Sequence, residues 1–208
     1  MERAEKAEAV ALAACVTAFC VAMGLREVLN IWIGTGAAAV ISVLALWLGA
    51  RPALRSNLGP PVGTNLVVGL SVGVLMSLAT WWLYPISISV FAPIQTEVET
   101  LYALLRQAPG PVRAFPVLLL VVAAEELVWR GVAIDLFSKS LGPWRAMFVS
   151  ALLYVLPQVA LRSPLLIIVA LCCGLLWGAL RVRTKGLAAP FVAHLLWDIL
   201  VFVWYPVA

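Results

Sequence analysis

The stretch of sequence that decides the fold is "VVAAEELVWRGVAI", residues 121–134. It is apolar at both ends, and its middle carries two adjacent carboxylates and an arginine, Glu125, Glu126 and Arg130. An ionised side chain at the centre of a bilayer costs about 2.5–3.5 kcal/mol on insertion scales. Such residues persist in a membrane helix when they pair or when they carry out a function. The stretch therefore predicts a bilayer span that holds a candidate functional site.

The composition of the whole chain points to the same class of protein. Of its 208 residues, 64% are hydrophobic and 12% are charged, whereas a soluble globular domain has about 25% charged residues. One soluble core of this size cannot bury so much apolar surface, so the sequence predicts a polytopic integral membrane protein. The net charge of +4 comes with no basic cluster interleaved with aromatics. The lipid bilayer is therefore an expected partner, and nucleic acid is not.

We predict an all-α fold, a transmembrane helical bundle that forms a single integral membrane domain over residues 1–208. Each span needs about 20 apolar residues. Seven spans are predicted, at 9–25, 31–50, 65–83, 114–135, 146–161, 164–180 and 187–205.

Two connections between these spans are informative. Residues 51–64, rich in Pro and Gly, are predicted to be a solvated loop. Residues 94–113 place leucines at helical spacing beside charged side chains. This pattern predicts a short amphipathic helix that lies at the membrane interface and ends before Pro109.

The distribution of Lys and Arg predicts the orientation. If the N-terminus is cytoplasmic, the seven spans put nine basic residues inside (Arg3, Lys6, Arg51, Arg55, Lys139, Arg145, Arg181, Arg183 and Lys185) and four outside (Arg26, Arg106, Arg113 and Arg162). This bias favours a cytoplasmic N-terminus and an outward C-terminus. A bacterial inner (cell) membrane is the expected location.

A second polar cluster lies on the last predicted span. His194 is the only histidine of the chain, and Asp198 follows it by four residues on the same helix face. Asp198 can accept a hydrogen bond from one ring nitrogen and direct the other toward a cavity. Glu126 and Arg130 are also four apart and can pair, which leaves Glu125 rotated by about 100° from Glu126.

Each cluster also has a purely structural interpretation. Glu126 and Arg130 could be a buried ion pair that fixes helix packing, and His194 and Asp198 could form a hydrogen bond between helices. Asp135 is expected to be solvated near the inner end of its span. Both clusters fall near the middle of their spans, which favours a shared function.

These residues resemble two motifs of the CPBP family, the CAAX-protease and bacteriocin-processing family also called Abi. "EELVWR" (125–130) matches EExxxR, and "HLLWD" (194–198) matches the last motif, HxxxN or HxxxD. The resemblance covers residues 114–205 as a catalytic core, whereas residues 1–113 match only as N-terminal spans and an interfacial helix. It implies an intramembrane peptidase, and among the members of the family the chain resembles the compact, divergent myxosortase type.

The middle motif of that family, FxxxH, corresponds here to "YVLPQ", residues 154–158. Tyr154 stands for the aromatic residue and is a candidate substrate-binding residue. Gln158 replaces the histidine; it can hydrogen-bond a water but cannot take a proton.

The resemblance implies a role for each residue of the site. Glu125 is the base that activates water, and Glu126 with Arg130 supports it. His194 and Asp198 stabilise the oxyanion. No HExxH pattern occurs, and one histidine is a poor start for a catalytic zinc site. We therefore expect no metal and no cofactor.

Three functions from different classes remain open. The leading hypothesis is an endopeptidase that cuts a membrane-anchored protein or peptide near a transmembrane segment, such as a C-terminal sorting signal. The alternative is a non-catalytic relative that binds a transmembrane peptide or supports bacteriocin immunity, because the middle histidine is missing. A proton-coupled carrier is the third, because carboxylates at mid-membrane also mark proton paths.

Overall fold

The computed structural model describes residues 2–57, 63–108 and 110–207, and all regular structure in these ranges is helical. The elements follow one another as α1 (Glu2–Gly24), α2 (Ile31–Gly49), α3 (Arg51–Asn57), α4 (Gly63–Val90), α5 (Pro93–Leu105), α6 (Pro111–Glu125), the π-helix η1 (Glu126–Ala133), α7 (Ile134–Leu141), α8 (Pro143–Val159), α9 (Pro164–Thr184), α10 (Ala188–Asp198) and the π-helix η2 (Ile199–Trp204).

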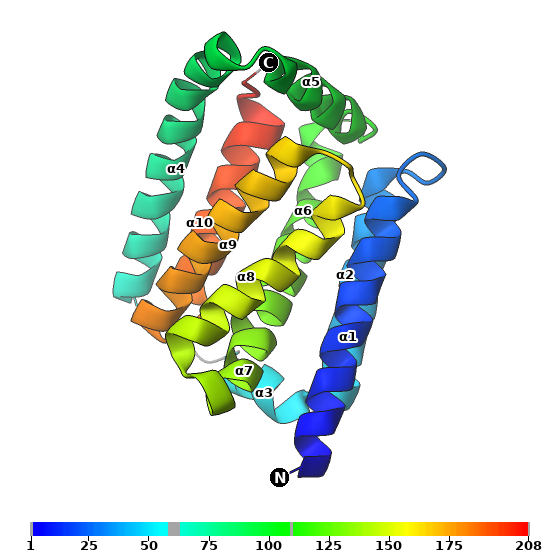
Figure 1. The fold of residues 1–208 in the computed structure, drawn as a ribbon, viewed down its shortest axis with the longest axis vertical. Coiled ribbons are helices and arrows are strands. Elements are labelled where there is room, and N and C mark those ends of the chain that lie inside the picture. The colour runs from blue at the N-terminus through cyan, green and yellow to red at the C-terminus, as the bar shows by residue number, and fades with distance from the viewer. Residues whose placement is uncertain (1, 58–62, 109, 208) are drawn as a thin grey trace.

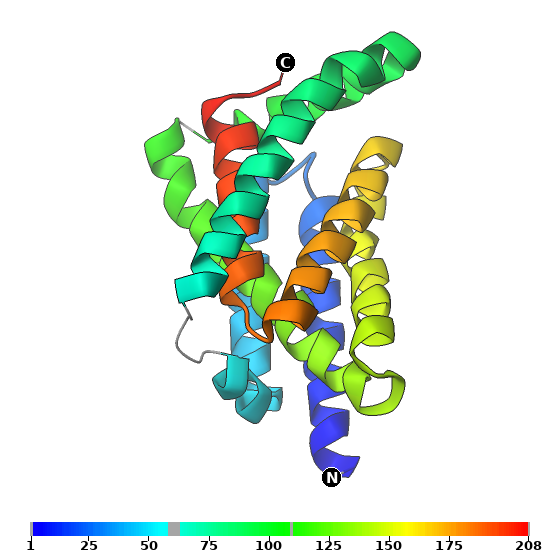
Figure 2. The same cartoon turned by 90° about the vertical axis from the view of Figure 1, so that its left-hand side faces the viewer.

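The long helices run between two ends of a bundle, with the N-terminus at one end and the C-terminus at the other (Figure 1). Helix α1 packs mainly on α2, α8 on α9, and α4 on α10. The short helices α3 and α7 lie at the N-terminal end, and α5 crosses the opposite end (Figure 1). Figure 2 shows that α4 leans across the outer side of α10.

Four helices are long and apolar enough to cross a membrane: Arg3–Gly24, Ile31–Gly49, Gly63–Val90 and Pro164–Thr184. The other lengthwise segments are shorter. Helix α8 has 17 residues, and α6 has 15 before its backbone becomes π-helical. The transmembrane helical class is therefore supported for four helices, and the seven crossings stay a prediction.

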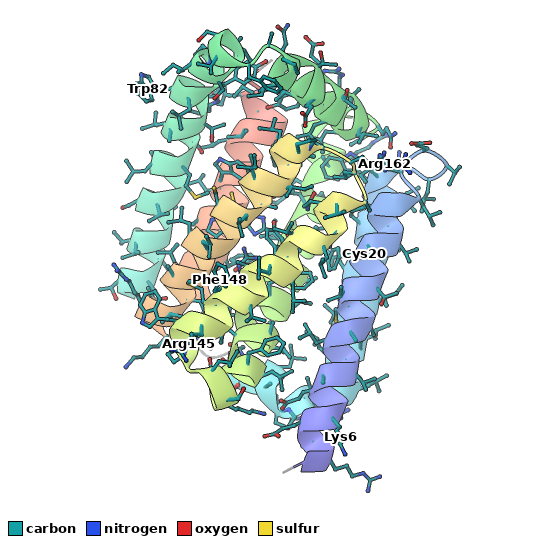
Figure 3. The ribbon with its side chains drawn as sticks, viewed as in Figure 1. Lys6, Cys20, Trp82, Arg145, Phe148 and Arg162 are labelled. Atoms are coloured by element: carbon teal, nitrogen blue, oxygen red, sulfur yellow. The ribbon has the colours of Figure 1, made fainter. Side chains whose placement is uncertain are left out.

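Charged and apolar side chains separate along the bundle axis. Lys6 and Arg145 lie toward the N-terminal end and Arg162 toward the opposite end, while Cys20 and Phe148 lie between them (Figure 3). The exposed surface between the ends is rich in large apolar side chains, including Leu48, Val67 and Ile168. This pattern is typical of a lipid-facing surface. The cytoplasmic placement of the N-terminus stays a prediction.

The connections differ from the expected ones. Residues Arg51–Asn57 form helix α3 rather than a loop, and residues 58–62 lie outside the described residues. The amphipathic helix at 94–113 is present as α5, which ends at Leu105; Pro109 lies outside the described residues. The Trp32 indole donates to the Leu105 carbonyl (2.8 Å), so α5 is tied to α2 at the end of the bundle.

Close packing of α4 on α10 sets the position of the last motif. A Cβ atom on Gly69 would lie 2.7 Å from the Ala189 carbonyl oxygen, and one on Gly73 would lie 3.0 Å from the Ala193 carbonyl oxygen. Two small residues four apart thus let the helix backbones approach closely, as in other membrane helix pairs. Ala193 directly precedes His194, so this contact fixes the depth of the histidine.

Candidate active site

The two polar clusters meet at one imidazole ring. His194 Nδ1 lies 2.8 Å from Glu126 Oε1, across from α10 to the start of η1. The other ring nitrogen, Nε2, lies 3.5 Å from Asp198 Oδ2 and 3.9 Å from Glu125 Oε2. The structure therefore brings together residues that are 68 positions apart, and both predicted clusters belong to a single site.

Glu126 and Arg130 form the predicted ion pair, with Arg130 Nη1 3.3 Å from Glu126 Oε1. Both side chains are almost completely buried, at 1% and 2% exposed. The guanidinium also lies over two aromatic rings, 4.4 Å from the centroid of Tyr154 and 5.0 Å from that of Trp177. These cation–π contacts add to the attraction between Glu126 and the desolvated guanidinium.

His194 is held more rigidly than predicted, and by a different partner. Its ring stacks on Trp177, with centroids 3.7 Å apart and planes 19° apart. The short hydrogen bond of the ring goes to Glu126 (2.8 Å), whereas Asp198, the partner predicted from the i,i+4 spacing, lies 3.5 Å from Nε2. A carboxylate paired with Arg130 accepts, so Nδ1–H donates to Glu126, and this tautomer turns Nε2 toward Asp198 and Glu125.

A cavity of about 170 Å³ lies beside the ring. Five of the seven predicted residues line it: Glu125, Tyr154, Gln158, His194 and Asp198. Glu126 and Arg130 do not; they lie behind the wall. The adjacent glutamates thus have different surroundings, as the helical offset predicted: one is paired with arginine and the other faces the cavity.

The backbone changes form at both carboxylate positions. The π-helix η1 begins directly after Glu125, and η2 begins directly after Asp198. Such i→i+5 segments are rare and occur often at functional sites, because they displace side chains from their regular helical positions. Both stretches were predicted to be regular helix, and no residue type in them signals the change.

Further residues of the site were missed. Trp177 stacks on the histidine, and Met23, Ile31 and Trp32 line the cavity from the first two helices. For Trp177 a signal was available, because a tryptophan in the middle of an apolar segment lies away from the interfacial belt where this residue usually gathers. The N-terminal residues carry no comparable signal.

Asp135 is not simply solvated, contrary to the prediction. Its carboxylate lies 3.0 Å from Arg181 Nη2 and accepts a hydrogen bond of 2.8 Å from Asn57. The side chain is 34% exposed, so water reaches it as well. Its partners come from α3 and α9, which the sequence could not place beside it.

Over residues 2–57, 63–108 and 110–207, no group of three or more His, Cys, Asp or Glu side chains is arranged to hold a metal ion. Metal-free chemistry stays a prediction, and the reaction proposed below uses only the side chains of the site.

Comparison with known proteins agrees with the site. Residues 107–200 match the family model described as type II CAAX prenyl endopeptidase Rce1-like. This range is somewhat less than half of the chain and contains all seven predicted site residues. No curated protein and no solved structure matches the chain. The fold and site are thus those of an all-helical membrane protein whose C-terminal half is similar to a CAAX-type protease; nothing supports the myxosortase subtype.

Proposed function

We propose that this protein is an intramembrane endopeptidase, which hydrolyses a peptide bond of a membrane-anchored protein or peptide near a transmembrane segment. The observation that carries the proposal is the division of labour between two adjacent glutamates. Glu126 is neutralised by Arg130 behind the wall. Glu125 faces a cavity beside an oriented histidine. The family match at residues 107–200 supports the same class of reaction.

The reaction begins with a water in the cavity. Glu125 takes a proton from this water, and the resulting hydroxide attacks the carbonyl carbon of the substrate. Gln158 lines the same cavity and can orient the water through its amide, without accepting a proton. Tyr154 lines the same cavity as Glu125, where its ring can contact the substrate.

His194 completes the reaction. The proton on Glu125 passes to Nε2, 3.9 Å away in the free enzyme, and such distances shorten in the substrate complex. The imidazolium, flanked by Glu126 and Asp198, donates from Nε2 to the oxyanion of the tetrahedral intermediate. The same proton then goes to the leaving amine as the C–N bond breaks. The base is left free for the next water.

The cavity limits the form of the substrate. A volume of about 170 Å³ is close to that of an engineered cavity of roughly 150 Å³ that holds benzene. It admits one side chain, not a helix, so the substrate is extended where it is cut. Leu105 of α5 and Trp32, which is hydrogen-bonded to it, line the cavity, so the cavity extends toward the end of the bundle where α5 lies. With a cytoplasmic N-terminus, this favours cleavage at the outer side, where a C-terminal sorting signal is one suitable substrate.

The test compares wild type with Glu125→Gln in a host that lacks the native gene. Both proteins are expressed at equal levels, and the membrane and surface proteomes are searched for uncleaved precursors. We expect precursors with Glu125→Gln only. Glu99→Gln is the matched control, because Glu99 is an exposed glutamate on α5 that does not line the cavity. Identical proteomes from folded wild type and Glu125→Gln would contradict the proposal.

One observation favours a second function, a non-catalytic protein that binds a transmembrane peptide. Gln158 lines the cavity where a second proton acceptor would strengthen the base. A binding protein would keep its cellular effect in Glu125→Gln, because no proton transfer would be involved.

A further inference from the structure

A second, partly buried polar cluster lies at the N-terminal end of the bundle, and the reaction above does not use it. Arg181, near the end of α9, places Nη2 3.0 Å from Asp135 Oδ1 and 3.1 Å from Asn57 Oδ1. Asn57 in turn donates to Asp135 Oδ2 (2.8 Å). The three side chains come from α3, α7 and α9, which meet at this end (Figure 1). Each therefore holds the other two in place.

The cluster reaches the active site through one hydrogen bond. Arg181 Nε donates to the backbone carbonyl oxygen of Arg130 at 3.1 Å. In a regular helix that carbonyl accepts from residue 134. Here the N–H of Ile134 bonds to the Gly131 carbonyl, at the end of the π-helix η1. The arginine from α9 therefore contacts the backbone of Arg130 where the helix is irregular.

We propose that Arg181 is a positioning residue for the catalytic site. It holds the end of η1 so that the Arg130 guanidinium stays against Glu126 (3.3 Å), which in turn holds His194 (2.8 Å). The inference rests on the proposed function for its effect on catalysis. Its structural step, from Arg181 to the ring of His194, does not depend on proteolysis.

The geometry explains why an arginine is required here. Its planar fork uses Nε for the carbonyl and Nη2 for the carboxylate and the amide at the same time. A lysine has one nitrogen on a flexible stem and cannot hold both sides. Asn57 also packs on Gly131, where an added Cβ would lie 3.4 Å from its side chain. The clamp therefore covers the backbone beside Arg130, and Asn57 lies outside the residues that match the family model.

The test uses the single histidine of the chain. Protein labelled with ¹⁵N-histidine gives signals from His194 alone, and these report the hydrogen bond to Glu126. We compare wild type, Arg181→Lys and Arg183→Lys in lipid bilayers. Arg183 is the matched control, because it lies two residues further along α9 and faces the Trp144 ring instead. We expect the Nδ1 signal to move in Arg181→Lys and to stay in Arg183→Lys, with unchanged melting midpoints.

Kinetics on the cleaved precursor then test the consequence. We expect kcat to fall by roughly tenfold to a hundredfold in Arg181→Lys with little change in KM, because small misplacements of catalytic groups have effects of this size. An unmoved His194 signal in folded Arg181→Lys would overturn the proposal, as would a moved signal with wild-type kcat. If Glu125→Gln accumulates no precursor while the His194 signal still moves, the proteolytic function fails and the positioning contact stands.

Discussion

Replacing Glu126 by glutamine should destabilise the protein far more than the same change at Glu125. The Arg130 guanidinium is buried, and Glu126 is the carboxylate paired with it. Breaking a buried ion pair by removing one partner costs roughly 3–5 kcal/mol, because the remaining charge is uncompensated. Glutamine keeps an oxygen for His194, so the hydrogen bond itself is preserved. The loss of stability in Glu126→Gln therefore reports the uncompensated charge of Arg130, not the loss of the hydrogen bond to His194.

The size of the stability loss distinguishes an unpaired arginine from the simple loss of a hydrogen bond between helices. A hydrogen bond between membrane helices is worth about 0.6 kcal/mol on average. A loss of several kcal/mol lowers the folded-to-unfolded ratio by about two to three powers of ten, since about 1.4 kcal/mol is tenfold. Only the unpaired arginine accounts for a loss of that size. The cation–π contacts to Tyr154 and Trp177 reduce it without cancelling it.

The assay is reversible unfolding in mixed micelles, with wild type, Glu125→Gln, Glu126→Gln and the double variant Glu126→Gln/Arg130→Met. Removing both charges leaves no unpaired ion, so the double variant should recover much of the lost stability. Glu125→Gln should unfold close to wild type, because its nearest basic group is His194 Nε2 at 3.9 Å. Equal losses in both glutamine variants, or additive losses in the double variant, would refute this reasoning.

Three further predictions concern the rest of the chain. Gln158→Ala should lower kcat about fivefold in a precursor-cleavage assay, since one hydrogen bond to the water is worth about 1 kcal/mol, and Gln158→His should be at least as active as wild type. Glu97 accepts a hydrogen bond from the Leu165 N–H (3.1 Å) at the start of α9, so Glu97→Ala should lower the free energy of unfolding by about 1 kcal/mol. The hydrogen bond from Lys139 to Glu8 (2.7 Å) raises the pKa of Lys139 above its ordinary 10.5. Its stabilisation is therefore complete below pH 10.5 and is lost as the pH rises through the raised value, and melting midpoints at alkaline pH should lose this step in Glu8→Gln.

The sequence was most informative about ionisable residues in apolar segments, because such residues are too costly to occur there without a role. A carboxylate, an arginine or a histidine in an apolar helix is expensive, so Glu125, Glu126, Arg130 and His194 stood out without any structure. The i,i+4 rule also found the Glu126–Arg130 pair, which is a local contact. Candidate residues and local pairs were therefore predictable.

Contacts between distant segments were not predictable in the same way. The hydrogen bond between His194 and Glu126 depends on how α10 crosses η1, and that crossing depends on glycines of α4 that carry no functional signal. The two π-helices are also invisible in the sequence, because they follow from how each helix end is held. Arg181 was predicted to lie just after a span on the inner side, whereas in the structure its guanidinium donates to the backbone carbonyl of Arg130.

The ionisable groups of the site and part of its cavity wall come from different parts of the chain. All groups that carry charge or protons in the site come from residues 107–200, the range that matches the protease family. The cavity wall, in contrast, is completed by Met23, Ile31 and Trp32 from the first two helices and by Leu105 from α5. Substitutions in these wall residues change which side chain fits beside Glu125 without touching the proton path. Under the proposed function, the groups that carry out the reaction and part of the wall that would contact the substrate therefore lie in different parts of the chain, and the match to the protease family covers the first of these.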